Sequence, residues 1–292
     1  MLSILVPIYR FDAGALIREL HEQATSSGIP FEVLCMDDGS GPGFEHNATV
    51  CNDLPHAHYL ALPENIGRSA IRNRLAQEAG YDHVLLLDCD AALPDGRFIE
   101  RYVPFLNKDM VVYGGRSYQA SPPDNKQLML HWLYGSNREA IPAEGRSGYQ
   151  QFMTNNILVP RQVVLNHPLS ETLKGYGHED TLWGLELEAA GIPIEHINNP
   201  LVHIGLETAA SFLQKTREGV QNLLRLDAMG VDDRHIQLLA TYRKLKRWRL
   251  RGLIRQVMRI KMPWLEKNLL SSNPSLFYFD LYKLGCMLGA VR

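Results

Sequence analysis

The sequence predicts an α/β fold in which helices cover both faces of a doubly wound, mainly parallel sheet, followed by a helical C-terminal extension. Over about the first 115 residues, short apolar runs alternate with longer amphipathic segments, as in successive βαβ units. Glycine and proline cluster at residues 39–43 and 94–96, which places loops between these segments. The 292 residues, 45% of them hydrophobic, are enough for one such core and an additional segment.

The predicted elements of the first half alternate regularly. Residues 3–7 form an apolar run that we interpret as the first strand, because neither a basic region before it nor a cleavage-like site after it marks a secretory signal. The elements that follow are predicted as a helix over residues 13–26, strands over 31–36 and 59–62, a helix over 68–79 and a strand over 83–87.

The second half has a mixed pattern that ends in helices. A helix is predicted over residues 126–139, a loop over 144–148, a strand over 152–159 and a helix that begins near His178. Beyond Leu206 almost every segment has helical periodicity. We therefore predict a main domain of residues 1–205, divided at about residue 115, and a helical extension of residues 206–292.

Charge is distributed unevenly along the chain. The whole chain carries 30 Lys and Arg and 32 Asp and Glu, a formal net charge of −2, but residues 243–292 hold 12 basic and 2 acidic residues. Such asymmetry is typical of a basic segment with a partner of its own. No uninterrupted apolar stretch reaches the roughly 18 residues of a membrane span. The four cysteines lack CxxC spacing, which favours a reducing compartment over a disulfide framework or a zinc site.

The clearest chemical signal is a pair of carboxylates that follows the predicted strand 83–87. Asp88 and Asp90 lie two residues apart, so both point the same way if the strand geometry continues. Ligands of parallel sheets bind at the carboxyl ends of the strands, and carboxylate oxygens suit Mg²⁺ or Mn²⁺ that bridges phosphates. The alternative is an ordinary turn with two solvated aspartates.

Two further motifs favour a polar cleft at the same edge of the sheet. Asp37 and Asp38 follow the neighbouring predicted strand, although an Asp-Gly turn is the alternative. Gly67 opens the helix predicted from residue 68, and Arg68 and Arg72 lie four residues apart on one face of that helix. A helix N-terminus with two guanidinium groups suits a diphosphate, whereas the alternative is a solvated basic face.

A glycine-containing loop, residues 175–177, precedes another helix. Glu179 and Asp180 occupy the first turn of that helix, a position that the helix dipole favours for acidic residues in any case. The loop would be a mobile segment beside one of these carboxylates, which could deprotonate the hydroxyl of a substrate. His203 follows a short predicted strand and, without further context, is expected to be structural rather than a metal ligand.

Taken in order, these motifs resemble the family 2 inverting glycosyltransferases, which have the GT-A fold. The resemblance extends over about residues 1–205, and the motifs that carry it are Val6-Pro7-Ile8-Tyr9, Asp37-Asp38-Gly39-Ser40, Asn65-Ile66-Gly67 with Ala70-Ile71-Arg72-Asn73, Asp88-Cys89-Asp90, and Gly177-His178-Glu179-Asp180. Residues 175–187 followed by His203 also resemble the C-terminal half of the catalytic domain in galactosyltransferases and N-acetylgalactosaminyltransferases. His178 departs from that pattern, because those relatives usually carry glycine there.

The resemblance implies a role for each matching residue. Asp90 and His203 would bind Mn²⁺ or Mg²⁺, Asp180 would be the general base, and Glu179 would contact the acceptor. The implied donor site comprises Pro7 and Tyr9 through their backbone, Asp38 at the ribose, Arg72 at the nucleotide, Asp88 at the sugar or ribose, Asn156 at the sugar or acceptor, and Gly67 and Arg68 at the helix N-terminus.

The function that follows is transfer of a sugar from a nucleoside diphosphate, with UDP as the expected nucleotide, to a saccharide or lipid-linked acceptor hydroxyl with inversion. Residues 1–115 would bind the nucleotide-sugar and residues 116–205 the acceptor, in surface polysaccharide or glycoconjugate synthesis. One alternative is a nucleotidyltransferase that makes sugar nucleotides, although Tyr9-Arg10-Phe11-Asp12 lacks the glycine-rich loop that would hold a triphosphate. The other is a non-catalytic module of a membrane-bound complex.

The basic segment predicts a partner of its own. Like charges four residues apart destabilise a helix by roughly 0.2–0.5 kcal/mol per pair, so a helix over 243–267 requires counter-charge. We expect an anionic membrane surface with Trp248 and Trp264 at the interface, which makes the protein cytoplasmic and peripheral on the inner face of the cytoplasmic membrane. Docking on the acidic main domain is the alternative, and no nucleic-acid module accompanies the segment. The arginines that recur at every fourth position are Arg243, Arg247, Arg251, Arg255 and Arg259.

Overall fold

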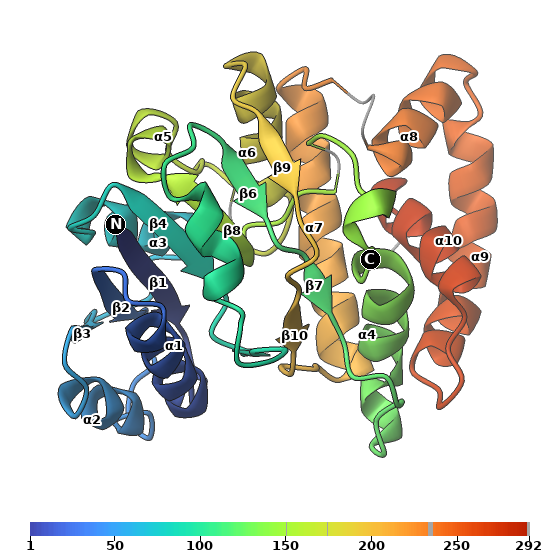
Figure 1. Ribbon diagram of the computed structural model, residues 1–292. Coiled ribbons are helices and arrows are strands. Elements are labelled where there is room, and N and C mark those ends of the chain that lie inside the picture. The colour runs from blue at the N-terminus through green and yellow to red at the C-terminus, as the bar shows by residue number, and fades with distance from the viewer. Residues whose placement is uncertain (150, 174, 233–235, 291–292) are drawn as a thin grey trace. The chain divides into compact units, whose positions relative to one another are not determined.

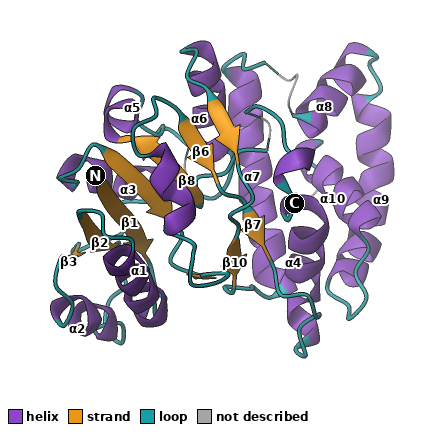
Figure 2. Ribbon diagram, viewed as in Figure 1, coloured by secondary structure: helices purple, strands orange, loops and turns teal. Residues whose placement is uncertain are grey.

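The chain forms two compact units, which are described separately. A computed structural model describes residues 1–149, 151–173, 175–232 and 236–290. The first unit comprises residues 1–119, 139–172 and 179–205, and the second comprises residues 120–138, 173–178 and 206–292. Both sheets lie in the first unit, and the second unit is helical (Figure 1; Figure 2). The α/β class and the helical C-terminal region predicted from the sequence are confirmed.

A seven-stranded, mainly parallel sheet forms the centre of the first unit (Figure 2). Its first four strands in spatial order are parallel, and the fifth runs antiparallel to both of its neighbours. The four strands at that end correspond to the apolar runs predicted from the sequence. The spatial order is β3 (Ala57–Ala61), β2 (Phe31–Asp37), β1 (Leu2–Ile8), β4 (His83–Leu87), β8 (Asn156–Pro160), β6 (Val111–Tyr113) and β9 (Ile194–His196).

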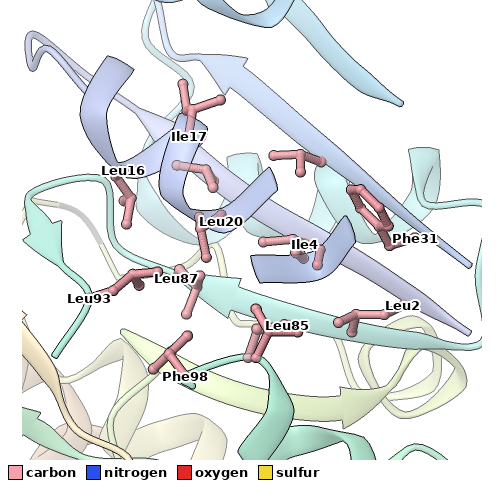
Figure 3. Packing of buried hydrophobic residues seen from close by; sticks show 14 of the residues in the cluster. Leu2, Ile4, Leu16, Ile17, Leu20, Phe31, Leu85, Leu87, Leu93 and Phe98 are labelled. Atoms are coloured by element: carbon pink, nitrogen blue, oxygen red, sulfur yellow. The ribbon is translucent and has the colours of Figure 1, made fainter. Parts of the chain in front are cut away.

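Side chains of alternating strand residues enter two different cores. Ile4 of β1 and Leu85 of β4 point toward one face, where α1 (Gly14–Ser26) covers them with Leu16, Ile17 and Leu20 (Figure 3). Neighbouring residues such as Leu5 and Leu86 lie in the opposite core with Ile71 and Leu75 of α3 (Arg68–Glu78). Because both faces are buried, these strands are continuous apolar runs rather than alternating ones.

A second, three-stranded sheet places His203 beside Asp90. The strands are β5 (Ala91–Ala92), β10 (Leu201–His203) and β7 (Arg116–Ser117), with β10 in the centre. In the antiparallel register of β10 with β5, His203 lies opposite Ala91. The Asp90 carbonyl accepts a hydrogen bond from the Ile204 backbone N–H at 2.9 Å. A Cβ at Gly205 would lie 2.6 Å from the Asp90 Cβ, so only glycine allows this close approach.

Shorter elements complete the first unit, and few of them were predicted. Packing and hydrogen bonds within the folded unit hold them, since they are too short to carry a periodic signal. The predicted strand 152–159 begins four residues later, at Asn156. These elements are α2 (His46–Asn52), η1 (Glu100–Phe105), η4 (Ala143–Gly145) and α5 (Arg161–Asn166). The longer helix that was predicted to begin near His178 is present as α6 (Glu179–Ala189).

The second unit consists of helices, as predicted. The helix predicted over residues 126–139 is present as η2 (Lys126–Leu128), α4 (Met129–Tyr134) and η3 (Gly135–Glu139), a stretch that ends in the first unit. In the described residues, no helix has both the length and the apolar character needed to cross a membrane. The remaining helices are α7 (Ala209–Ala228), α8 (Gln237–Arg247), α9 (Arg251–Leu269) and α10 (Leu276–Met287).

The prediction of one continuous basic helix over residues 243–267 is wrong. Helix α8 ends at Arg247 and α9 begins at Arg251. Arg249 has a φ of 59°, and the Leu250 N–H donates to the Leu245 carbonyl at 3.1 Å, which is a helix-ending arrangement. Repulsion among the closely spaced cations gives a physical reason for a break here, because a continuous helix would align them on one face.

Candidate active site

The carboxyl ends of three parallel strands bring the predicted acidic motifs to one edge of the sheet. Strands β1, β2 and β4 run in the same direction, and they end immediately before Tyr9, Asp38 and Asp88. The Asp38 N–H donates to the Ile8 carbonyl at 2.8 Å, which fixes the end of β2 beside that of β1. This edge is where ligands of parallel sheets bind.

Asp88 is held between two arginines. Its Oδ1 forms an ion pair with Arg72, and its Oδ2 accepts from Nη2 of Arg116 at 3.0 Å. Burial would raise the pKa of Asp88, but the positive charges of Arg72, Arg68 and Arg116 outweigh it and hold the pKa well below its usual value. Asp88 is therefore ionised, and both of its oxygens are engaged by guanidinium groups.

Asp90 and His203 meet in a pocket beside this cluster. Nδ1 of His203 lies 3.4 Å from Oδ1 of Asp90. Burial opposes ionisation of Asp90, but the contact with His203 outweighs it and lowers the pKa of the carboxyl. The pocket is lined by Asp88, Asp90, Ala91, Arg116, Asn155, Leu201 and His203.

The side chains of Asp90 and His203 are of the kinds that could hold a divalent cation. The carboxylate oxygen and the imidazole nitrogen, 3.4 Å apart, are both ligand types that Mn²⁺ accepts. The described residues contain no group of three or more His, Cys, Asp or Glu side chains that could hold a metal. The two residues would therefore be the protein's share of a site whose remaining ligands are phosphate oxygens and water.

Asp38 and Gly67 together shape the loop before α3. The two carboxylate oxygens of Asp38 accept from the backbone N–H groups of Ile66 at 2.7 Å and of Gly67 at 3.2 Å. Gly67 caps α3 with a φ of 94°, which favours glycine at this position. Burial raises the pKa of Asp38, although these hydrogen bonds act against it. Pro7 is partly buried, and Tyr9 is 43% exposed.

The two arginines of α3 are already paired with carboxylates. Nε of Arg68 donates to Oε1 of Glu179 at 2.6 Å, and Nη1 of Arg72 donates to the Arg68 carbonyl at 3.0 Å. Arg72 is buried, so the alternative of a solvated basic face does not hold for it, and only Arg68 is partly exposed. The helix therefore links Asp88 of β4 to Glu179 at the start of α6.

Asp180 has the properties of a proton acceptor. Thr154 Oγ1 donates to its Oδ1 at 2.5 Å, and Thr154 directly precedes Asn155 of the pocket. Burial, with the negative charge of Glu179, raises the pKa of Asp180 to about 6. Burial would also raise the pKa of Glu179, but Arg68 outweighs it and lowers that pKa. The two adjacent carboxyls thus have opposite shifts, as an acid–base site requires.

The structure places Asn156 in the core, which corrects its predicted role at the donor. Asn156 is fully buried, and its Oδ1 accepts from the Tyr102 hydroxyl at 2.7 Å. Its Nδ2 donates to the Gly115 and Asn199 carbonyls, each at 2.8 Å. Both N–H donors are therefore used inside the core, and the buried side chain is not accessible to a ligand. The preceding residue, Asn155, lines the pocket, and its Oδ1 has no hydrogen-bond partner among the described residues.

Replacing Asn156 by alanine is expected to destabilise the fold by about 2–4 kcal/mol, because two buried carbonyls and a hydroxyl lose their partner. Urea unfolding, followed by far-UV circular dichroism, measures this loss. The matched variant Asn155→Ala is expected to change stability by less than about 1 kcal/mol. Equal losses in the two variants would contradict the assignment of Asn156 to the core and Asn155 to the pocket.

Sequence reasoning missed three polar residues around Asp88. Arg116 contacts Asp88 and also donates through Nη1 to Oε2 of Glu139 at 3.2 Å. The Tyr118 hydroxyl hydrogen-bonds the same Glu139 oxygen, and the Tyr118 ring packs edge-on against His203 at 5.4 Å. The pair Gly114-Gly115 directly before Arg116 was the available signal, since such pairs often mark a close backbone approach.

A family model and several solved structures match this chain. The model described as Glycosyl transferase family 2 matches residues 3–163. A search of the curated proteins gives no match. The mannosyltransferase PcManGT from Pyrobaculum calidifontis, solved with GDP-Man and Mn²⁺, aligns with a TM-score of 0.56 and 15% identity over 78% of this chain and 64% of its own.

Two further structures align at similar levels. S. aureus TarS 1-349 in complex with UDP gives a TM-score of 0.53 and 15% identity over 99% of this chain and 89% of its own. Glucosyl-3-phosphoglycerate synthase from Mycobacterium tuberculosis, in complex with phosphoglyceric acid, gives a TM-score of 0.52 and 16% identity over 80% of this chain and 81% of its own. This chain spans less than two thirds of the length of the mannosyltransferase. It also covers only 65% and 66% of the length of two other TarS structures. At these identities the likeness establishes the fold alone.

Proposed function

The chain belongs to glycosyl transferase family 2 and has the GT-A fold, and from this premise we propose that it transfers a sugar from a nucleoside-diphosphate donor to an acceptor hydroxyl with inversion. The observation that carries this proposal is the pocket in which Asp90 and His203 lie 3.4 Å apart beside Asp88 and Arg116. It joins two metal-ligating side chains to fixed positive charge, which is what a diphosphate leaving group requires.

Each residue around the pocket has its own role in the proposed reaction. Asp180 accepts the proton of the acceptor hydroxyl as that oxygen attacks the anomeric carbon and the bond to the diphosphate breaks. Arg72 and Arg116 orient Asp88 and stabilise the negative charge that grows on the departing diphosphate. A single base on the face opposite the leaving group gives inversion. Arg68 holds Glu179, which is placed to contact the acceptor.

Asp90 and His203 would hold Mn²⁺ or Mg²⁺, which when bound supplies Lewis-acid stabilisation of the diphosphate oxygens. The carboxylate and imidazole are ligands that Mn²⁺ accepts readily. Tyr118 packs edge-on against His203 and limits the orientations of its ring. Asn155 adds a side-chain oxygen at the same pocket.

UDP is the nucleotide that we propose for the donor, and a saccharide or a lipid-linked sugar for the acceptor. Solved neighbours of the same fold contain UDP-GlcNAc or GDP-Man, so both nucleotides belong in a test. We assign residues 1–115 to the donor, 116–205 to the acceptor and 206–292 to a helical extension, with a role in surface polysaccharide or glycoconjugate synthesis. The likeness of residues 175–187 to galactosyltransferases remains a prediction.

A donor panel measured by thermal unfolding tests the function. With Mn²⁺ present, one UDP-sugar at about 100 times its Kd is expected to raise Tm by roughly 5–10 °C and to be hydrolysed slowly, whereas chelator removes both effects. GDP-mannose, UMP and inorganic phosphate are the comparisons. The proposal is wrong if no nucleotide-sugar shifts Tm, or if only a nucleoside triphosphate with a sugar phosphate is turned over.

A further inference from the structure

Helix α9 has an apolar stripe that faces solvent. Leu253 is 61% exposed, Val257 47%, Ile260 79% and Trp264 52%. At 3.6 residues per turn, the spacing of these four residues places them within a sector of about 60° on one side of the helix. A stripe of four large apolar side chains on an isolated helix face is larger than the single exposed hydrophobic residues that soluble surfaces ordinarily carry.

Packing within the second unit uses a different side of the same helix. Met258, Met262, Leu265 and Leu269 are buried, and they lie roughly 140° around the helix from the exposed stripe. Gly285 of α10 allows this contact, because a Cβ there would lie 2.4 Å from the sulfur of Met262. The buried face therefore accounts for the fold of the unit, and the exposed stripe is an additional apolar face.

Basic residues surround the exposed stripe. On the helical wheel Lys261 lies on one side of it and Lys267 on the other, and Arg259 lies between the stripe and the buried face. All three are exposed, and none forms an ion pair with a described residue of the second unit. In residues 244–267 the single acidic residue, Glu266, is already paired with Arg217. Within the described part of the second unit, these three cations therefore have no counter-charge.

The corner between α8 and α9 extends this surface. Trp248 is 53% exposed and Leu250 38%, and Arg247 and Arg249 beside them are also exposed. Nζ of Lys244 lies 4.6 Å from the Trp248 ring centroid. Tryptophan beside arginine and lysine is the composition found at the boundary between lipid headgroups and acyl chains.

We propose that this surface, the exposed stripe of α9 with the α8–α9 corner, docks in the headgroup region of an anionic lipid bilayer. The apolar stripe enters the boundary with the acyl chains, Trp248 and Trp264 lie at the interface, and the flanking cations contact anionic headgroups. The proposal is independent of the transferase function, because it rests on α8 and α9 alone. It rests on the apolar stripe of α9 rather than on the regular array of five arginines, which the break between α8 and α9 divides.

A bilayer fits this surface better than a second copy of the chain or a nucleic acid. A two-fold contact through the stripe would bring the flanking cations of one copy, Lys261 and Lys267, close to the same cations of the other. Nucleic acid would satisfy the cations, but a phosphate backbone gives no environment for four large apolar side chains. Anionic lipid provides both the counter-charge and the apolar environment.

Co-sedimentation of the full chain with vesicles tests the proposal. The protein is expected to bind vesicles of equal parts phosphatidylglycerol and phosphatidylcholine, to bind pure phosphatidylcholine much more weakly, and to be released as salt rises. The variant with Leu253, Val257, Ile260 and Trp264 all changed to Gln is expected to bind at least about 100-fold more weakly. Lys261→Glu combined with Lys267→Glu, which reverses the two flanking charges, is expected to weaken vesicle binding about 30-fold or more.

Matched controls separate this surface from general apolarity and charge. Met229→Gln changes a residue that is 58% exposed in the same unit, and Lys126→Glu reverses an exposed charge there. Both are expected to bind vesicles as the parent does. Glutamine is a good helix former, and unchanged far-UV circular dichroism verifies that the stripe variant is folded.

Three results would overturn the proposal. One is parent binding that does not depend on phosphatidylglycerol or that the stripe variant retains. Another is a dimer by analytical ultracentrifugation without vesicles that the stripe variant converts to a monomer, which would assign the surface to self-association. The third is that duplex DNA displaces the protein fully from anionic vesicles and binds the stripe variant as tightly as the parent. The surface would then be a binding site for a polyanion rather than for a bilayer.

Discussion

Replacement of Asp90 by asparagine is expected to lower kcat/KM by about 10³-fold or more and to abolish stimulation by Mn²⁺. Asparagine keeps the size of the side chain but removes the charge that pairs with His203 and that a divalent cation requires. Lewis-acid stabilisation of a leaving diphosphate is worth several kcal/mol, and each 1.36 kcal/mol is tenfold in rate. Steady-state kinetics across a Mn²⁺ series measures the effect.

A double-variant cycle makes the Asp90 test sharper. If Asp90 and His203 hold one ion, Asp90→Asn combined with His203→Ala is expected to lose little more than the more damaging single variant. Binding of Mn²⁺ in the presence of UDP, followed by electron paramagnetic resonance, is expected to weaken in parallel. Asp53→Asn, at an exposed carboxylate, is the control and should leave both quantities unchanged. Fully multiplicative losses with normal Mn²⁺ binding would remove Asp90 and His203 from the metal site.

Asp180→Asn is expected to lower kcat by about 10²–10⁴-fold and to leave the donor Kd nearly unchanged, because a general base acts in the transition state. The comparison variant is Glu179→Gln, which alters the adjacent carboxylate and its contact with Arg68. It is expected to raise the acceptor KM more than it lowers kcat. The base assignment is refuted if Asp180→Asn weakens donor binding while bound donor is turned over at the parent rate.

The pH profile gives an independent test of Asp180. Burial raises the pKa of this carboxyl to about 6, so kcat/KM is expected to fall as the pH drops through about 6 and the base is protonated. Thr154→Val removes the hydroxyl that donates to the carboxylate, which raises the pKa further and moves the acid limb to higher pH. The fall of kcat/KM at low pH would belong to another group in either of two cases. One is that its midpoint does not move in Thr154→Val, and the other is that the residual activity of Asp180→Asn still shows it.

The parallel half of the fold could be predicted because its central strands, β1 and β4, are buried on both faces. Residues 2–8, 31–37 and 83–87 are apolar runs of strand length separated by helices, and that arrangement admits few topologies. Strand β6, with three residues, and β9 could not be predicted, because their pairing partners, and not their own sequences, make them strands. The position of β8 between β4 and β6, antiparallel to both, could not be predicted either, because it depends on pairing in the assembled sheet.

The motif residues of the site were predictable where each follows a recognisable strand or begins a helix. Asp88, Asp90 and Asp180 are of this kind, and the structure places Asp90 beside His203, which the resemblance to known enzymes had paired with it. The choice between Asn155 and Asn156 was not predictable, since it depends on where β8 begins: Asn155 lies in a turn and Asn156 in the core. Arg116 was missed because its partner Asp88 is distant in the sequence.

The pairing of β8 with β4 also determines the order in which this site can assemble during folding. Strands β1, β2, β3 and β4 follow one another along the chain and close short βαβ loops, so they can pair early. Leu87 pairs with Asn156 only after the long intervening segment has closed, and this event brings Thr154 and Asn155 to the sheet edge. The parallel half of the sheet can thus be native-like before Thr154 and Asn155 have reached the acidic edge. If the proposed function is correct, binding of nucleotide-sugar is expected to report completion of the antiparallel pairing rather than collapse of the N-terminal core.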